Sequence, residues 1–141
     1  MRERPAGYGA IVVDASVAVQ WFARESGSES SAALLEGTRT LIAPDIMPTE
    51  VANALWRKSR HGDLPEADLS PAITRLLDTH IVYISTLALL ARATRLAVQS
   101  GHPVYDCVYL VLATERGATL ATIDARLGRT ATAQGLRLWR P

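Results

Sequence analysis

The sequence predicts an α/β fold in three layers, in which helices cover both faces of a parallel sheet. Short apolar runs alternate with helix-like segments along the chain, which is typical of this class. The strand-like runs are apolar throughout, which favours burial on both faces of the sheet. A length of 141 residues and a hydrophobic fraction of 48% suit one domain with a buried core.

The expected strands are recognised by their aliphatic and β-branched residues and by polar or turn-forming residues beside them. The first run, Ala-Ile-Val-Val, is the clearest example. The expected strands cover residues 10–13, 40–43, 81–84, 118–121 and 136–138.

The expected helices carry apolar residues at helical spacing, and several end at a glycine, a frequent helix terminator. Pro48 suits the first turn of its helix, whereas Pro71 should start or kink a helix near residue 70. Thr86 is a candidate N-cap. The segment 103–116 is apolar nearly all round, which predicts deep burial. The expected helices cover residues 15–24, 30–37, 45–60, 64–78, 86–100, 103–116 and 124–134.

Several classes of protein and site are excluded by composition and motif content. A single cysteine, Cys107, excludes an intramolecular disulfide framework and a cysteine-based zinc finger, and it fits a reducing cytoplasm. The sequence contains no run of about 18 apolar residues, so it predicts no membrane-spanning helix. Asp14 interrupts the first apolar run, which argues against a signal peptide. Glycine-rich nucleotide motifs and a nucleophile elbow are absent, and His61, His80 and His102 are expected in solvated or capping roles.

Four acidic residues stand where parallel strands end or where helices begin: Asp14, Glu50, Asp106 and Asp124. In open α/β sheets, ligands bind at the edge formed by the carboxyl ends of the strands. Each acid also has a structural interpretation. Asp14 and Asp124 suit helix capping, Asp106 suits the dipole of its helix, and Glu50 is spaced to pair with Arg57.

As a set, these acids need a shared counter-charge, because removing unpaired carboxylates from water is unfavourable. Mg²⁺ or Mn²⁺ prefers carboxylate oxygens, and the lack of histidine or cysteine in the set argues against zinc. Glu50, Asn53 and Arg57 share one helical face, where Asn53 is placed to orient Glu50 and Arg57 to meet a phosphate. A solvated polar face explains the same spacing.

Four segments in order carry a resemblance to a known family. They are Val12-Val-Asp-Ala-Ser-Val-Ala-Val-Gln-Trp21, Ala43-Pro-Asp with Pro48-Thr-Glu-Val-Ala-Asn-Ala-Leu-Trp-Arg57, Val104-Tyr-Asp-Cys-Val-Tyr-Leu-Val-Leu-Ala113, and Leu120-Ala-Thr-Ile-Asp-Ala-Arg-Leu127. The chain resembles PIN-domain ribonucleases, specifically the VapC toxins of toxin–antitoxin pairs. The resemblance implies a single PIN domain over residues 10–141, a disordered tail over residues 1–9, and a five-stranded parallel sheet in the order 3-2-1-4-5.

The resemblance also implies a site and a reaction. Asp14, Glu50, Asp106 and Asp124 would be the catalytic and metal-binding residues, supported by Thr122, Asn53 and Arg57. Mg²⁺ or Mn²⁺ would be held chiefly by Asp14 and Asp106, with Glu50 and Asp124 holding metal or its water, for hydrolysis of an RNA phosphodiester. A cysteine follows Asp106 where the family usually has another small residue.

The implied partners are an RNA substrate, a VapB-like antitoxin and a second copy of the chain in a homodimer, with no membrane association. Trp21, Phe22 and Trp56 are candidates for an apolar groove that accepts an antitoxin helix, or are ordinary core aromatics. A catalytically inert PIN domain that binds protein or RNA is the main alternative. A receiver domain would need a phosphate-accepting aspartate after the third strand and a lysine near the last strand, and the sequence has neither at these places. A haloacid-type phosphatase would need an aspartate where Ser16 stands.

Overall fold

A parallel sheet of four strands forms the centre of the molecule in the computed structural model, which describes residues 9–23 and 28–139. The strand order is β3-β2-β1-β4. The strands are β1 (Ile11–Val13), β2 (Leu41–Pro44), β3 (Val82–Ile84) and β4 (Thr119–Ala121). The chain thus moves outward from β1 to β3 and returns to place β4 on the other side of β1. This reversal is a topological switch point.

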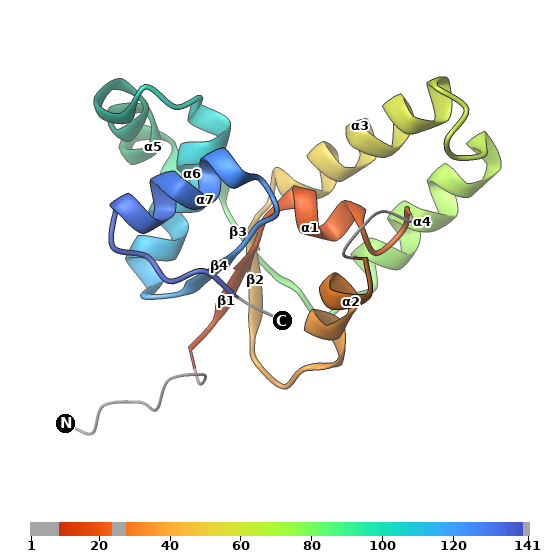
Figure 1. The fold of residues 1–141 in the computed structure, drawn as a ribbon, viewed down its shortest axis with the longest axis horizontal. Coiled ribbons are helices and arrows are strands. Elements are labelled where there is room, and N and C mark those ends of the chain that lie inside the picture. Colours follow the sequence, from red (N-terminus) through yellow and green to blue (C-terminus); the bar gives the residue numbers. More distant parts are fainter. Residues whose placement is uncertain (1–8, 24–27, 140–141) are drawn as a thin grey trace.

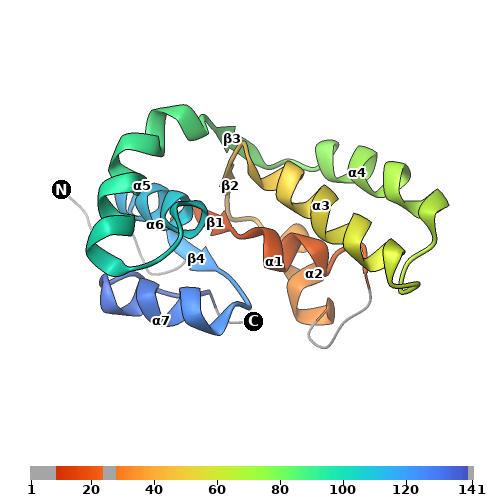
Figure 2. The same ribbon diagram turned by 90° about the horizontal axis from the view of Figure 1, so that it is seen from above.

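Helices lie on both sides of this sheet, as the alternating pattern predicts. Figures 1 and 2 show α5, α6 and α7 on one side and α1 to α4 on the other. The helical segments are α1 (Ala15–Val19), α2 (Ser28–Glu36), α3 (Met47–Arg60), the short 3-10 helix η1 (Glu66–Asp68), α4 (Leu69–Leu77), α5 (Thr86–Ser100), α6 (Val104–Arg116) and α7 (Ala125–Ala133).

The core is built around β1, which is buried at every residue, and α6, which contributes six buried residues. Val12 and Val13 are fully buried, and their parallel partners Ile42, Leu120 and Ala121 are buried as well. Helix α6 packs against β1, β2 and β4. Six of its residues are buried, which confirms the deep position that its apolar composition predicts.

The expected fifth strand over residues 136–138 is reduced to a single parallel bridge between Leu120 and Leu138. The amide of Leu120 donates to the carbonyl of Arg137, and the amide of Trp139 donates to the carbonyl of Leu120. Pairing is therefore confined to one residue of β4, whereas the expected order 3-2-1-4-5 required a further strand. The part of the order that involves the first four strands is confirmed.

Two helix ends differ from expectation for local reasons. The first helix ends at Val19 rather than near residue 24, because the amides of Gln20, Trp21 and Phe22 bond three residues back instead of four. Ser85, not Thr86, is the N-cap of α5, and its hydroxyl accepts from the amide of Ala88 at 3.4 Å.

Pro71 lies in the first turn of α4, as its position in the sequence suggested, after a separate short helix. His61 and His80 are exposed, but His102 is buried, which corrects the expectation of a solvated or capping role for it. The expected disordered tail lies outside the described residues except for Gly9. No helix in the described residues is long and apolar enough to cross a membrane.

Candidate active site

Asp14 lies directly after β1 and is buried at the switch point between β1 and β4. Its Oδ2 atom accepts hydrogen bonds from the hydroxyl of Ser16 at 2.5 Å and of Thr122 at 2.8 Å. The Thr122 hydroxyl in turn accepts from the amide of Asp124 at 3.1 Å. A short chain of hydrogen bonds therefore links the carboxyl ends of the neighbouring strands β1 and β4.

Asp14 and Asp124 are both candidates for helix capping by sequence, but only Asp124 caps a helix with its side chain. Asp14 precedes α1 but makes no side-chain capping bond, and its carboxylate accepts hydrogen bonds from the hydroxyls of Ser16 and Thr122 instead. The Asp124 carboxylate does cap α7, because its Oδ1 accepts from the amides of Arg126 and Leu127 at 2.9 and 3.1 Å. Asp124 therefore has a structural role whatever else it does.

Glu50 stands in the first turn of α3 and meets a residue of α6. Its Oε1 accepts a 2.7 Å hydrogen bond from the hydroxyl of Tyr109, which is almost fully buried. The hydrogen bond that the structure gives Glu50 thus comes from Tyr109 and not from Asn53. No ion pair between Glu50 and Arg57 is present in the described part of the chain.

Burial and mutual repulsion disfavour the charged forms of these acids. Burial raises the pKa of Asp14, the hydroxyls of Ser16 and Thr122 oppose this, and the charge of Asp106 adds to it. Burial also raises the pKa of Glu50 to about 7; the Tyr109 hydrogen bond opposes the rise, and the charges of Asp14 and Asp106 reinforce it. Burial, followed by the charges of Asp14 and Glu50, raises the pKa of Tyr109 well above its ordinary value.

One pocket of about 920 Å³ is lined by all four candidate acids, Asp14, Glu50, Asp106 and Asp124. Asn53 and Arg57 also line it, as their shared helical face predicts. Thr122 does not line this pocket, but its hydroxyl donates a hydrogen bond to Asp14, which does. The structure therefore brings the predicted acids from four different segments to one cavity.

The described residues contain no group of three or more histidine, cysteine or acidic side chains placed to hold a metal ion. The donor set nevertheless fits Mg²⁺ or Mn²⁺, which are bound through carboxylate oxygens and retain waters or substrate oxygens as further ligands. Asp14 and Glu50 show why a cation suits the pocket: both have raised pKa values that a neighbouring positive charge would lower.

Ser16 and Tyr109 are site residues that sequence reasoning missed. Ser16 stands two residues after Asp14, a spacing at which a hydroxyl can reach the carboxylate. Tyr109 stands three residues after Asp106 and therefore shares its helical face, although the surrounding apolar sequence makes it look like an ordinary core aromatic. Spacing was the available signal for both.

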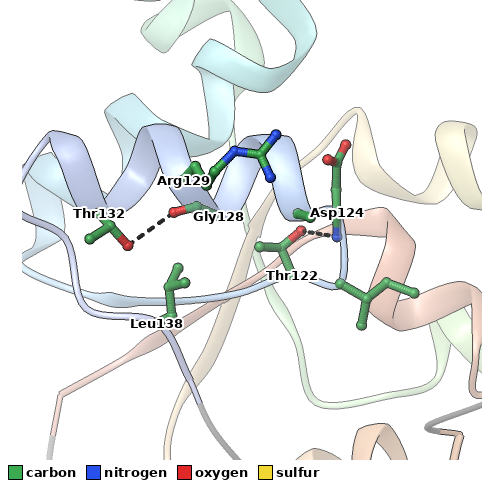
Figure 3. Close-up of a pocket in the computed structure, with 8 residues that line it drawn as sticks. Thr122, Asp124, Gly128, Arg129, Thr132 and Leu138 are labelled. Carbon is green, nitrogen blue, oxygen red and sulfur yellow. Dashed lines mark hydrogen bonds between the residues drawn. The ribbon is translucent and has the colours of Figure 1, made fainter.

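A second pocket of about 500 Å³ adjoins the first and shares Ile123 and Asp124 with it. Figure 3 shows this pocket, with the Thr122–Asp124 hydrogen bond below the start of α7 and the Asp124 carboxylate pointing away from Thr122. Arg129 of α7 lines this second pocket. Guanidinium groups thus stand in both pockets, Arg57 in one and Arg129 in the other.

Comparison with known proteins gives consistent matches over most of the chain. Residues 11–133 match the family model of the PIN domain. A relative named Ribonuclease VapC3, from Pyrobaculum aerophilum, is 33% identical over 119 residues, covering 83% of this chain and 91% of the relative.

Two solved structures share the fold at low sequence identity. Mycobacterium tuberculosis VapC20, described as a toxin that cleaves the sarcin–ricin loop, has a TM-score of 0.75 at 15% identity, covering 93% of this chain and 99% of that one. VapBC2 from Rickettsia felis, bound to a promoter DNA fragment, has a TM-score of 0.63 at 14% identity, covering 92% and 97%. Because the family model matches residues 11–133 and the Pyrobaculum relative is 33% identical over most of both chains, the chain belongs to the PIN-domain family.

Proposed function

We propose that this chain is a metal-dependent endoribonuclease and the toxin of a toxin–antitoxin pair. The observation that carries the proposal is the pocket in which Asp14, Glu50, Asp106 and Asp124 meet, with burial and mutual charge raising the pKa values of Asp14 and Glu50. The relationship to Ribonuclease VapC3 of Pyrobaculum aerophilum supports RNA as the substrate class.

Asp14 and Asp106 are the proposed principal ligands for Mg²⁺ or Mn²⁺, with Glu50 and Asp124 beside them. When bound, such a cation lowers the pKa of water and stabilises negative charge on phosphate oxygens. Ser16 and Thr122 restrict the Asp14 carboxylate, and Tyr109 restricts Glu50. Because these bonds are already formed, the acids keep their positions without reorganising during the reaction.

The basic and amide groups at the pocket suit the flanking RNA backbone. Arg57 offers a planar guanidinium that matches the geometry of a phosphate, and Asn53 lies one turn before it on the same helix. Arg129 lines the adjoining pocket and is proposed to contact a neighbouring phosphate of the same strand.

A VapB-like antitoxin and a second copy of the chain remain the proposed protein partners. The VapBC2 structure from Rickettsia felis, which shares the fold of this chain, supports a VapB-like partner. Of the three aromatic candidates, Trp56 is 46% exposed beside Arg60, whereas Trp21 and Phe22 are partly buried and pack against the core. Trp56 is therefore the aromatic best placed for a partner helix.

Induced expression of wild type and Asp106→Asn in a bacterial host tests the proposed activity. We expect growth arrest and new discrete RNA 5′ ends with wild type only. Asp63→Asn is a matched control, because Asp63 is an exposed acid in the loop after α3, outside the pocket. It should behave like wild type.

Purified protein gives the direct form of the same test. Wild type should cleave RNA with Mg²⁺ or Mn²⁺, and Asp106→Asn should lose cleavage while keeping its melting temperature within a few degrees. Equal cleavage by the two proteins would overturn the assignment of Asp106. Failure of wild type to cleave RNA or bind Mn²⁺ would favour a catalytically inert binding domain.

A further inference from the structure

His102 occupies the short loop between α5 and α6, and its backbone is fixed on both sides. Its amide donates to the hydroxyl of Ser100 at 3.3 Å, and the thiol of Cys107 donates to its carbonyl at 3.8 Å. The carbonyl of the preceding residue, Gly101, accepts from Arg126 at 3.4 Å. These hydrogen bonds fix the backbone of the loop from which the His102 side chain projects.

The imidazole is buried, with 8% of the residue exposed, and it lies between two polar side chains. Its Nε2 atom is hydrogen-bonded to the hydroxyl of Thr130 on α7. Its Nδ1 atom lies 3.5 Å from Oδ2 of Asp106 and is buried without a hydrogen-bond partner among the described residues. A buried nitrogen thus faces one of the four acids of the pocket at a distance that a small side-chain rotation would close.

The proton arrangement of the ring follows from what Asp106 can offer. An ionised carboxylate only accepts hydrogen bonds, so the contact is favourable only if Nδ1 carries a proton. In the neutral ring Nε2 is then an acceptor, and the hydroxyl of Thr130 donates to it. If Thr130 instead donated only to the carbonyl of Arg126, 3.2 Å away, Nε2 would hold the proton and a lone pair would face Asp106.

We propose that His102 is a positioning residue for Asp106, held in its Nδ1-protonated form by Thr130. The Nδ1 proton restrains Oδ2, so that the other oxygen, which accepts no hydrogen bond within the described residues, is available to the pocket. The inference rests on the proposed function, because Asp106 is a metal ligand only under that proposal. Groups behind metal ligands commonly orient the ligand in this way, and losing them weakens metal binding about 10- to 100-fold.

Nuclear magnetic resonance of the metal-free protein tests the proton arrangement independently of metal and of cleavage. The ¹⁵N shifts of the His102 ring distinguish the two neutral forms from each other and from the doubly protonated ring. We expect the proton on Nδ1. A proton on Nε2 would overturn the proposal.

Two substitutions of His102 separate positioning from simple loss of packing. His102→Asn keeps an N–H group near the place of Nδ1, whereas His102→Gln keeps one near the place of Nε2. Mn²⁺ affinity, measured by calorimetry on the full chain, should fall about 10- to 100-fold in His102→Gln and only a few-fold in His102→Asn. Equal losses in the two variants, or no loss in either, would overturn the proposal.

Thr130→Val gives a second route that leaves the histidine in place, and Thr132→Val is its matched control. Both threonines lie on α7, but the hydroxyl of Thr132 donates to the carbonyl of Gly128, within the helix. Mn²⁺ affinity should fall in Thr130→Val and stay unchanged in Thr132→Val; equal affinities would overturn the role of Thr130. Failure of the wild-type chain to bind Mn²⁺ would instead overturn the proposed function, a result separate from the histidine measurement.

Discussion

The hydroxyl of Thr122, which follows β4, donates a 2.8 Å hydrogen bond to the carboxylate of Asp14, which follows β1. These residues are far apart in sequence, and the parallel pairing of β1 with β4 brings them together. The bond both fixes the orientation of Asp14 and opposes the rise in its pKa that burial causes. The contact between β1 and β4 at the switch point of the sheet thus also influences the pKa of Asp14.

Thr122→Val should raise the pKa of Asp14 further, because it removes a bond that favours the charged carboxylate. We expect unfolding to become easier by about 1 kcal/mol and Mn²⁺ affinity to fall about tenfold. Chemical denaturation and calorimetry measure the two effects. Thr114→Val is the control, since the Thr114 hydroxyl donates to the carbonyl of Leu110 within α6, outside the pocket. Unchanged Mn²⁺ affinity in Thr122→Val would contradict the role given to this bond.

Tyr109→Phe should raise the pKa of Glu50 above its value of about 7, because the Tyr109 hydroxyl favours the charged form. The loss of a buried hydrogen bond should also reduce stability by about 1–2 kcal/mol. Carbon NMR of the glutamate side chains across a pH titration gives the pKa directly. A Glu50 pKa that falls in the variant would show that Tyr109 does not stabilise the carboxylate.

The metal-free protein should lose stability as the pH rises from the ordinary glutamate value of 4.5 towards about 7. In this range the folded chain holds protons on Glu50 that the unfolded chain has released, so the slope of stability against pH is negative. The raised pKa of Asp14 acts in the same direction. Thermal melting in a metal chelator across this pH range measures the effect, and a stability that rises with pH there would contradict the raised pKa values.

Mn²⁺ should raise the melting temperature, and more so above the Glu50 pKa than below it, because protons and metal compete for the same oxygens. Millimolar Mn²⁺ is sufficient for the comparison. Asp106→Asn should reduce the gain, while Asp63→Asn should retain it. A melting temperature that does not respond to Mn²⁺ in wild type would argue against a cation site.

Two glycine substitutions should have opposite effects on stability. Gly128→Ala lies within α7, where an added Cβ would be 3.4 Å from the end of the Leu138 side chain, and helix propensity should stabilise the fold by about 0.5–1 kcal/mol. Gly117→Ala should destabilise it by about 1–2 kcal/mol, because Gly117 has a φ of +57° at the end of α6. Urea denaturation of both variants measures the difference. If Gly128→Ala is destabilising, the Leu138 side chain does not move away from the added Cβ.

Much of the fold could be predicted because local patterns report burial. The apolar run of β1, the glycine after α6 and the proline in the first turn of α4 each reflect forces within a few neighbouring residues. The residues at 136–138 show the limit of this reasoning. Their apolar spacing suits a strand, but whether they pair along β4 or at Leu138 alone depends on how the chain returns from α7.

The alternation of strands and helices and the four acids at their junctions can be predicted from the sequence, because both follow from residue type and spacing along the chain. The groups that touch those acids become apparent only once the chain is folded. Ser16 and Thr122 hold Asp14, Tyr109 holds Glu50, and His102 stands behind Asp106. Most of these contacts join distant segments, so they depend on strand register, helix packing and side-chain rotamers. Those same contacts and the depth of burial set the pKa values of Asp14 and Glu50, which spacing alone does not reveal.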